Sequence, residues 1–148
     1  PEKRKEVTTE GGLNLNKNLI LLKNILKLLK KKNIRTSLFI EPKLSDIRLA
    51  ANLKTDCIEL HTGKFCRLFL KKKSTTSSFN NLKKCILYAH NLDLEVHAGH
   101  GLTYESARLI SKIKHISELN IGHFIVSESI FIGLKKTINK FKKIINRS

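Results

Sequence analysis

The fold of this 148-residue chain is decided by the stretch His97-Ala98-Gly99-His100-Gly101-Leu102-Thr103-Tyr104. Residues 94–97 before it predict a short strand, and a helical pattern begins at Tyr104, so the stretch is a turn at the carboxyl end of a strand. Glycine lets the backbone approach a ligand closely, and histidine titrates near neutral pH. Together they favour a catalytic loop. The alternative is a tight turn in which one histidine is hydrogen-bonded for structural reasons.

Strands and helices alternate on both sides of this turn. Apolar runs or alternation predict strands at residues 35–40, 57–61, 94–97 and 118–121. Apolar residues at steps of three and four predict helices at 18–31, 46–53, 82–89, 104–114 and 125–146, with Ser45 as the N-cap of the second. Residues 71–81 (KKKSTTSSFNN) form either a flexible loop or the frayed start of a helix.

This alternation predicts an α/β fold with a parallel sheet covered by helices. Four strands could form a small open sheet. They could equally form part of a (β/α)8 TIM barrel, roughly strands 5–8 with their helices, since such a barrel typically has about 250 residues. On length alone we expect residues 1–148 to lie in one domain, in the second case the C-terminal part of a single β/α-barrel domain.

The composition limits the classes of function. Lys and Arg number 29 against 12 Asp and Glu, a net charge of +17, but the lysines are spread over nearly every helical segment and aromatic residues make up only 6%. Without a basic and aromatic groove we expect no nucleic-acid partner. The three cysteines lack CxxC spacing, which indicates a reducing, cytoplasmic setting. The apolar runs are too short for a bilayer, so we expect no membrane association.

Unusual polar residues and glycines fall within or directly after the predicted strands, where parallel α/β folds bind ligands. They are Thr8, Glu59, His61, His97, His100, Gly101, Gly122 and His123. Glycine-bearing turns that lead into helices offer backbone N–H groups to an anion, which predicts a phosphorylated small molecule as ligand. The histidines and cysteines lack a recognisable ligand spacing, so we expect no metal, and nothing indicates a cofactor.

Glu59 lies inside an otherwise apolar strand, and period-two alternation places it on the same face as His61. A carboxylate in such a position is costly unless it is paired. On pattern alone, a paired carboxylate in a site and a strand face open to solvent are equally good interpretations.

Several segments of the chain, in order and in spacing, resemble the pyridoxine 5'-phosphate synthase family. These segments are residues 1–4 (PEKR), 7–13 (VTTEGGL), 37–40 (SLFI), 58–63 (IELHTG), 98–104 (AGHGLTY) and 118–123 (ELNIGH). The resemblance implies a β/α barrel, of which this chain is similar to the part that follows strand four. It also implies condensation of 3-amino-2-oxopropyl phosphate with 1-deoxy-D-xylulose 5-phosphate by acid–base catalysis, giving pyridoxine 5'-phosphate, phosphate and water.

By this resemblance His100 is the proton donor and Glu59 stabilises charge in the transition state. Thr8, Gly101, Gly122 and His123 are ligand contacts, the last two at a phosphate. His61 and His97 receive no catalytic role, and for His97 we favour a supporting one. The family forms symmetric homo-oligomers, with an octamer implied. A non-catalytic truncated remnant that binds phosphorylated ligands or a partner subunit is the alternative function.

The family's first three strands bring a catalytic histidine, a catalytic glutamate and substrate-binding arginines, and these have no counterpart in the 148 residues. We therefore predict that this chain on its own forms no pyridoxine 5'-phosphate from the two substrates, because it holds half a site. A chromatographic assay of the purified chain tests this, and measurable product would contradict it.

Overall fold

The computed structural model describes residues 11–17 and 19–146, which form a four-stranded parallel sheet and seven helices. The strands lie in the order in which they occur along the chain: β1 (Ser37–Ile40), β2 (Cys57–His61), β3 (Glu95–Gly99) and β4 (Ile116–Asn120). The helices are α1 (Leu19–Lys31), α2 (Leu44–Asn52), α3 (Gly63–Leu70), α4 (Thr76–His90), α5 (Tyr104–Ile110), α6 (His123–Ile132) and α7 (Leu134–Ile145). The predicted α/β fold with a parallel sheet is thus confirmed.

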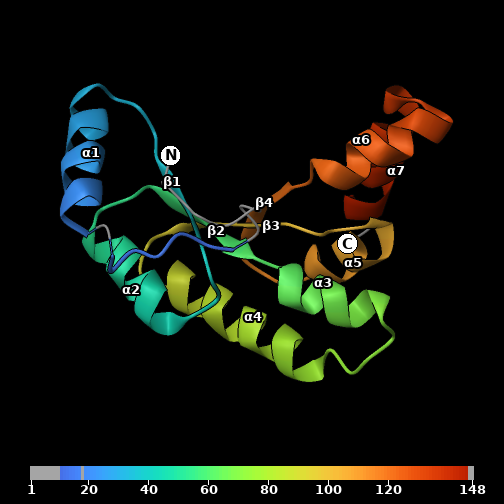
Figure 1. Ribbon diagram of the computed structural model, residues 1–148, viewed down its shortest axis with the longest axis horizontal. Helices are drawn as coiled ribbons and strands as arrows, with labels where there is room; N and C mark the ends of the chain where they lie inside the picture. The colour runs from blue at the N-terminus through green and yellow to red at the C-terminus, as the bar shows by residue number, and fades with distance from the viewer. Residues whose placement is uncertain (1–10, 18, 147–148) are drawn as a thin grey trace.

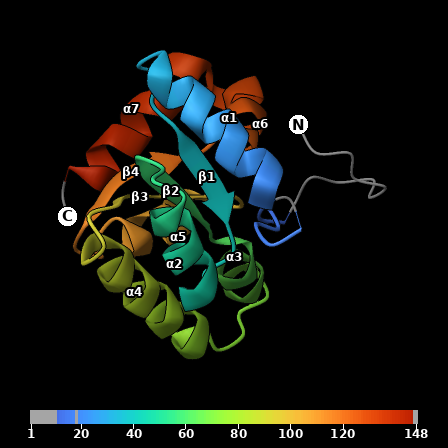
Figure 2. The same ribbon diagram turned by 90° about the vertical axis from the view of Figure 1, so that its left-hand side faces the viewer.

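The helices are distributed unevenly around the sheet. Helices α2 and α4 lie against one face, below the sheet in Figure 1, where α2 packs on β1 and α4 on β3. Helix α1 lies at one end of the molecule and the pair α6–α7 at the other (Figure 1). Figure 2, seen from the α1 end, again has α2 and α4 below the strands. The opposite face of the sheet carries no helix of the described chain (Figure 1), so the two faces differ in what they contact.

Side-chain alternation follows this difference. The residues that point to the helix-covered face are almost completely buried and apolar; they are Leu38, Ile40, Ile58, Leu60, Val96 and Ala98. The residues between them point to the open face. The strand register aligns Phe39, Glu59, His97 and Glu118 in one row across all four strands. The apolar face of the sheet packs against the helices, and the open face carries the polar groups.

A register shift between β3 and β4 completes this row. Val96 pairs with Ile116, but the next residue, His97, pairs with Glu118, so Ser117 is an extra residue in β4. Since one residue of slip sends every later side chain to the other face, the bulge brings Glu118 and Asn120 onto the open face.

Several helix boundaries differ from the prediction. Helix α2 begins at Leu44 with Lys43 as N-cap and no side-chain cap, so the prediction of Ser45 as the N-cap is wrong. Helix α3 has no counterpart among the predicted elements. Helix α4 begins at Thr76, inside the segment 71–81, because Phe79 packs against Phe65 at a ring distance of 5.7 Å.

The single helix predicted for residues 125–146 is two helices. Gly133 separates α6 from α7 with φ of 84°, a left-handed conformation that glycine adopts readily. Helix α7 buries Phe141 and Ile144, whereas α6 has no buried residue. Within the described ranges, no helix combines the length and apolar character that a membrane crossing requires.

Core packing against the helix-covered face predicts a clear stability difference. Replacing the fully buried side chain in Ile58→Ala should lower the free energy of unfolding by about 3 kcal/mol, because it leaves a cavity between sheet and helices. The matched variant Ile130→Ala, at a residue 78% exposed on α6, should change it by less than about 0.5 kcal/mol. Urea unfolding of both variants measures the difference, and equal losses would contradict the assignment of the core.

Candidate active site

Glu59 is the centre of the polar face. It is half-buried in the middle of β2, and its Oε2 accepts a hydrogen bond of 2.7 Å from Nδ2 of Asn120 on β4. Burial raises the pKa of Glu59, while the bond from Asn120 and the imidazoles of His97 and His100 act in the opposite direction. Of the two interpretations of Glu59, the structure therefore supports the paired carboxylate over a face simply open to water.

Gly99 explains how the carboxylate fits into the sheet. Gly99 pairs with both His61 and Asn120 in the strand register. A Cβ added to Gly99 would lie 2.1 Å from Oε1 of Glu59 and 2.9 Å from the carbonyl oxygen of Asn120. Any side chain here would displace the carboxylate, so the glycine before His100 is needed for space.

His100 follows β3 in a strained loop. Both His100 and Gly101 have positive φ, of 78° and 77°. Thr62 fixes the loop, since its Oγ1 lies 2.7 Å from the carbonyl oxygens of both Gly99 and His100. A non-glycine residue in the left-handed region is uncommon, although Asn, Asp and His adopt it more readily than most. The imidazole of His100 is thereby held near the carboxyl end of the sheet, close enough to Glu59 to affect its pKa.

His97 pairs with Glu59 in the strand register, and it lies nearer the amino end of β3 than the loop of His100. Its Nε2 is 2.8 Å from Oε1 of Glu95, and its Nδ1 is 3.9 Å from Oε1 of Glu118. Glu95 also forms an ion pair with Arg35, and His97 lowers the pKa of Glu95 by hydrogen bonding. This network ties three strand regions together on the open face.

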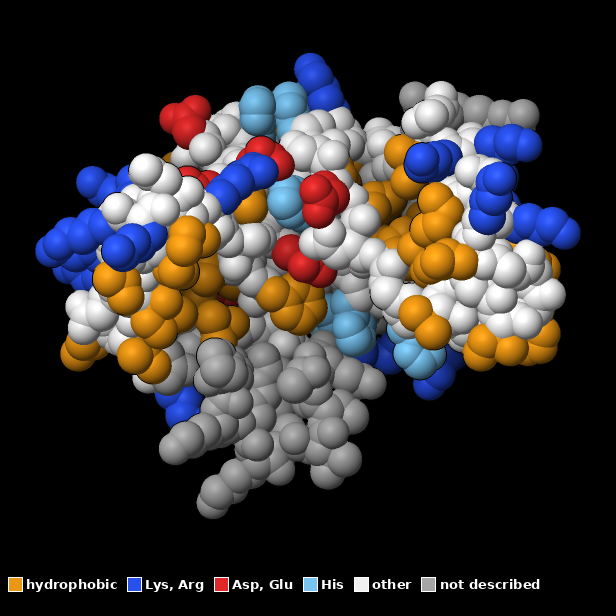
Figure 3. All heavy atoms as spheres, turned by 90° about the horizontal axis from the view of Figure 1, so that it is seen from above, with side chains coloured by type: hydrophobic (Ala, Val, Ile, Leu, Met, Phe, Trp, Pro, Cys, Tyr) orange, Lys and Arg blue, Asp and Glu red, His pale blue; other side chains and the backbone are white. Residues whose placement is uncertain are grey.

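Figure 3 shows this arrangement as a surface: acidic and histidine side chains gather in the middle of the face, and lysines are most numerous at its two ends. Among the described residues, no group of three or more His, Cys, Asp or Glu side chains is arranged to hold a metal ion. The cysteines Cys57, Cys66 and Cys85 are free and buried. Acid–base chemistry is what this face offers.

The two glycine turns occupy different surroundings. Gly101 lies in the His100 loop, and a Cβ there would be 3.2 Å from Cβ of Cys66. Gly122 and His123 are exposed at the start of α6, whose first turn carries no acidic residue and no side-chain cap. Their backbone is open to an anion. Thr8 lies outside the described residues.

Two residues of the site were missed by sequence reasoning. Asn120 binds Glu59, and Glu41, directly after β1, lies with its Oε1 2.8 Å from Nδ1 of His61. Period-two alternation in β4 could have indicated Asn120 only if the bulge at Ser117 had been known. Glu41 directly follows a predicted strand, where parallel α/β folds place site residues, and this signal could have indicated it.

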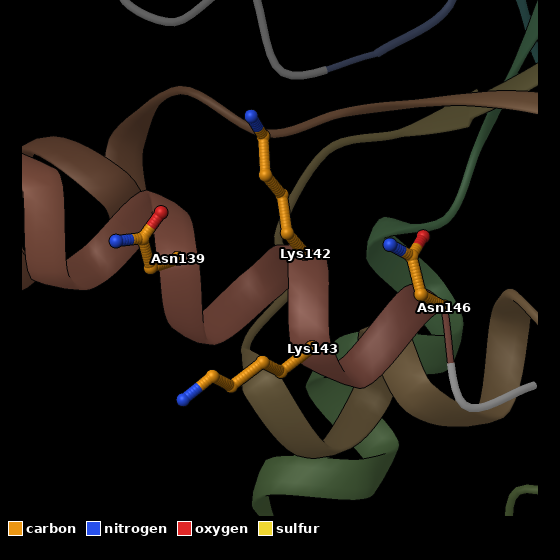
Figure 4. A pocket seen from close by; sticks show the side chains of 4 residues that line it. All are labelled: Asn139, Lys142, Lys143 and Asn146. Atoms are coloured by element: carbon orange, nitrogen blue, oxygen red, sulfur yellow. The ribbon is translucent and has the colours of Figure 1, made fainter.

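A shallow hollow at the C-terminal end of the described chain has no carboxylate or imidazole among its lining residues. About 380 Å³ in volume, it is lined by Asn139, Lys142, Lys143 and Asn146 of the C-terminal helix. The two lysines point away from each other (Figure 4), so they do not converge on a ligand.

The bond between Asn120 and Glu59 predicts a measurable change in acidity. In Asn120→Ala the pKa of Glu59 should rise further, because the bond that favours the charged carboxylate is lost. Because the folded pKa already lies above the unfolded value, Glu59 opposes folding as pH rises through the interval between them, and the variant widens that interval. Carbon-13 NMR titration of the Glu59 carboxyl measures the shift. Asn80→Ala, on the exposed side of α4, is the control, and an unchanged pKa in Asn120→Ala would contradict the role of the bond.

Comparison with known proteins identifies the family of this chain. The profile of the family described as "Pyridoxal phosphate biosynthesis protein PdxJ" matches residues 1–147. A relative from Pelagibacter ubique (strain HTCC1062), named pyridoxine 5'-phosphate synthase, is 56% identical over 147 residues, which are 99% of this chain and 62% of the relative. Relatives of the same name from Sulfurihydrogenibium sp. (strain YO3AOP1) and Hydrogenobaculum sp. (strain Y04AAS1) are 42% and 44% identical, over 98% and 99% of this chain and 59% and 62% of their own lengths.

The chain therefore spans about three fifths of the length of the curated relatives it matches. The match runs through the whole polar face described above, from the residues after β1 to the turn before α6. On the profile match and on these identities, the chain belongs to the PdxJ family of pyridoxal phosphate biosynthesis proteins.

Proposed function

We propose that this chain supplies part of the active site of a pyridoxine 5'-phosphate synthase, the name that its curated relatives carry. The reaction proposed is the condensation of 3-amino-2-oxopropyl phosphate with 1-deoxy-D-xylulose 5-phosphate to pyridoxine 5'-phosphate, phosphate and water. The observation that carries the proposal is the half-buried Glu59 beside the imidazole of His100 at the carboxyl end of a parallel sheet.

The chemistry of such a condensation matches these two groups. An amine must attack a ketone, water must leave, and protons must move on and off carbon, steps that need positioned acids and bases. A protonated imidazole at His100 donates the proton that a departing hydroxyl requires. In its ionised form, Glu59 stabilises positive charge that develops on nitrogen. Its raised pKa brings its protonated form closer to neutral pH, as a group that exchanges protons requires.

The phosphate groups have candidate positions as well. Gly101 and the Gly122–His123 turn expose backbone N–H groups near helix starts, and α6 begins without an acidic side chain that would repel an anion. Thr8 is proposed as a further contact. No metal or cofactor enters the proposal.

The architecture proposed for the whole protein is a (β/α)8 barrel, with these four strands as roughly strands 5–8 of a single domain. Supporting this, the sheet is purely parallel and its polar face carries no helix of the described chain (Figure 1). In a closed barrel that face would be the interior and its carboxyl edge the active-site rim. The family's symmetric homo-oligomer is part of the same proposal.

A chimera tests the function. The 148 residues replace the corresponding segment of the Pelagibacter ubique relative, which supplies the rest of a complete chain. The chimera should form pyridoxine 5'-phosphate, and Glu59→Gln or His100→Asn should each lower kcat by about 100-fold or more, since positioned acid–base groups contribute that much. Asparagine is chosen because it tolerates the positive φ of His100.

The control is Asp93→Asn, at an exposed residue before β3 that also has a positive φ, of 57°, and should keep full activity. Undiminished turnover in either site variant would refute the assigned roles. A folded but inactive chimera would instead favour the non-catalytic remnant.

A further inference from the structure

A second carboxylate–imidazole pair lies beside Glu59 and His100. Oε1 of Glu41 is 2.8 Å from Nδ1 of His61, the last residue of β2, and the same oxygen accepts the backbone N–H of Gly12 at 3.0 Å. Burial opposes the charge on this carboxylate, but the N–H of Gly12 and the ring of His61 outweigh it and lower the pKa of Glu41. An ionised carboxylate only accepts hydrogen bonds, so Nδ1 of His61 carries a proton.

The ring of His61 is packed against the ring of His100. Only 6% of His61 is exposed, and the two ring centres are 4.7 Å apart at an interplanar angle of 62°. Phe39 closes the cluster with ring distances of 5.3 Å to His61 and 6.4 Å to His100. The orientation of one imidazole therefore restricts the other.

Gly63 makes this approach possible. A Cβ at Gly63 would lie 2.6 Å from Nε2 of His61 and 3.0 Å from Cδ2 of His100. Nε2 of His61 is buried and has no hydrogen-bond partner within the described part of the chain. A buried imidazole with one nitrogen bound to a carboxylate and the other bare is costly for a purely structural residue.

We propose that His61, held by Glu41, is a positioning residue that orients the imidazole of His100. This inference rests on the proposed function, in which His100 donates a proton. Glu41 fixes the tautomer and rotation of His61, and the His61 ring in turn restricts the rotation of His100.

In the part of the chain that the structure describes, the titratable groups around His100 or its loop come from three elements. His61 and Glu59 come from β2, Glu41 from the segment after β1, and Cys66 of α3 lies against the neighbouring Gly101. Burial raises the pKa of the Cys66 thiol, so this group stays neutral. Among these, Glu41 and Glu59 are the sources of negative charge.

Another carboxylate–imidazole pair in the chain serves as a control for the positioning role of His61. His97 and Glu95 form a pair of the same chemistry at the same distance of 2.8 Å, near the amino end of β3. No ring contact joins His97 to His100 among the described residues. Breaking this pair removes one carboxylate–imidazole bond without touching the cluster of Phe39, His61 and His100.

Kinetics of the active chimera test the positioning role. Glu41→Gln and His61→Phe should each lower kcat by about 10-fold or more while KM stays within about 3-fold, because the proton donor loses its alignment and not its ligand. Glu41→Asp, which keeps the carboxylate, should recover part of the loss. Glu95→Gln should leave kcat unchanged.

A second measurement does not depend on turnover. In nitrogen-15 spectra of histidine-labelled 148-residue chain, His61 should show the Nδ1–H tautomer. Glu41→Gln should shift the ring signals of His100, because the ring of His61 that it holds is in contact with the ring of His100. Glu95→Gln should leave the ring signals of His100 unchanged.

Each outcome decides between the hypotheses. A kcat that stays within about 2-fold in both Glu41→Gln and His61→Phe, or falls equally in Glu95→Gln, overturns the positioning role. Ring signals of His100 that do not change in Glu41→Gln overturn it as well. Full activity of His100→Asn overturns the proposed function of His100 instead, whatever the other variants do.

Discussion

The shift of one residue between β3 and β4 is the constraint on which the polar face depends. If Ser117 paired with His97 in a regular register, Glu118 and Asn120 would point toward the helices. Glu59 would then lose the amide that holds it. A carboxylate in the middle of a sheet needs that partner, because burial alone raises its pKa. A local irregularity of one strand thus controls the chemistry of another strand two positions away in the sheet.

The two faces of the sheet divide stability from chemistry. The apolar residues of β1, β2 and β3 pack on helices and make up much of the core, while ionisable residues occupy the alternate positions. Within the polar face, carboxylates and imidazoles come in pairs: Glu41 with His61 and Glu95 with His97. Pairing lets several ionisable groups lie side by side at limited electrostatic cost, since each charge has a near partner.

The architecture could be predicted well from the sequence, but the local irregularities could not. Apolar runs and period-two alternation predicted all four strands, with bounds that differ by a few residues, and alternation predicted the face of Glu59. The sequence patterns did not predict the short helix α3, although Phe65 and Phe69 at a step of four were a usable signal. They also did not predict the break at Gly133, because the apolar spacing continues across a change of backbone direction. The bulge at Ser117 and the bond from Asn120 arise from pairing between distant segments, which a local pattern does not contain.

The left-handed conformation shared by His100 and Gly101 has a consequence for how this family can vary. The backbone that carries the His100 ring is held by two backbone torsions and by the hydroxyl of Thr62, and the ring itself packs against His61. Damage to those torsions would misdirect the imidazole while leaving the packing between sheet and helices intact. At this loop, loss of activity and loss of folding become separate events, and a variant library sorted only for thermal stability would retain inactive members.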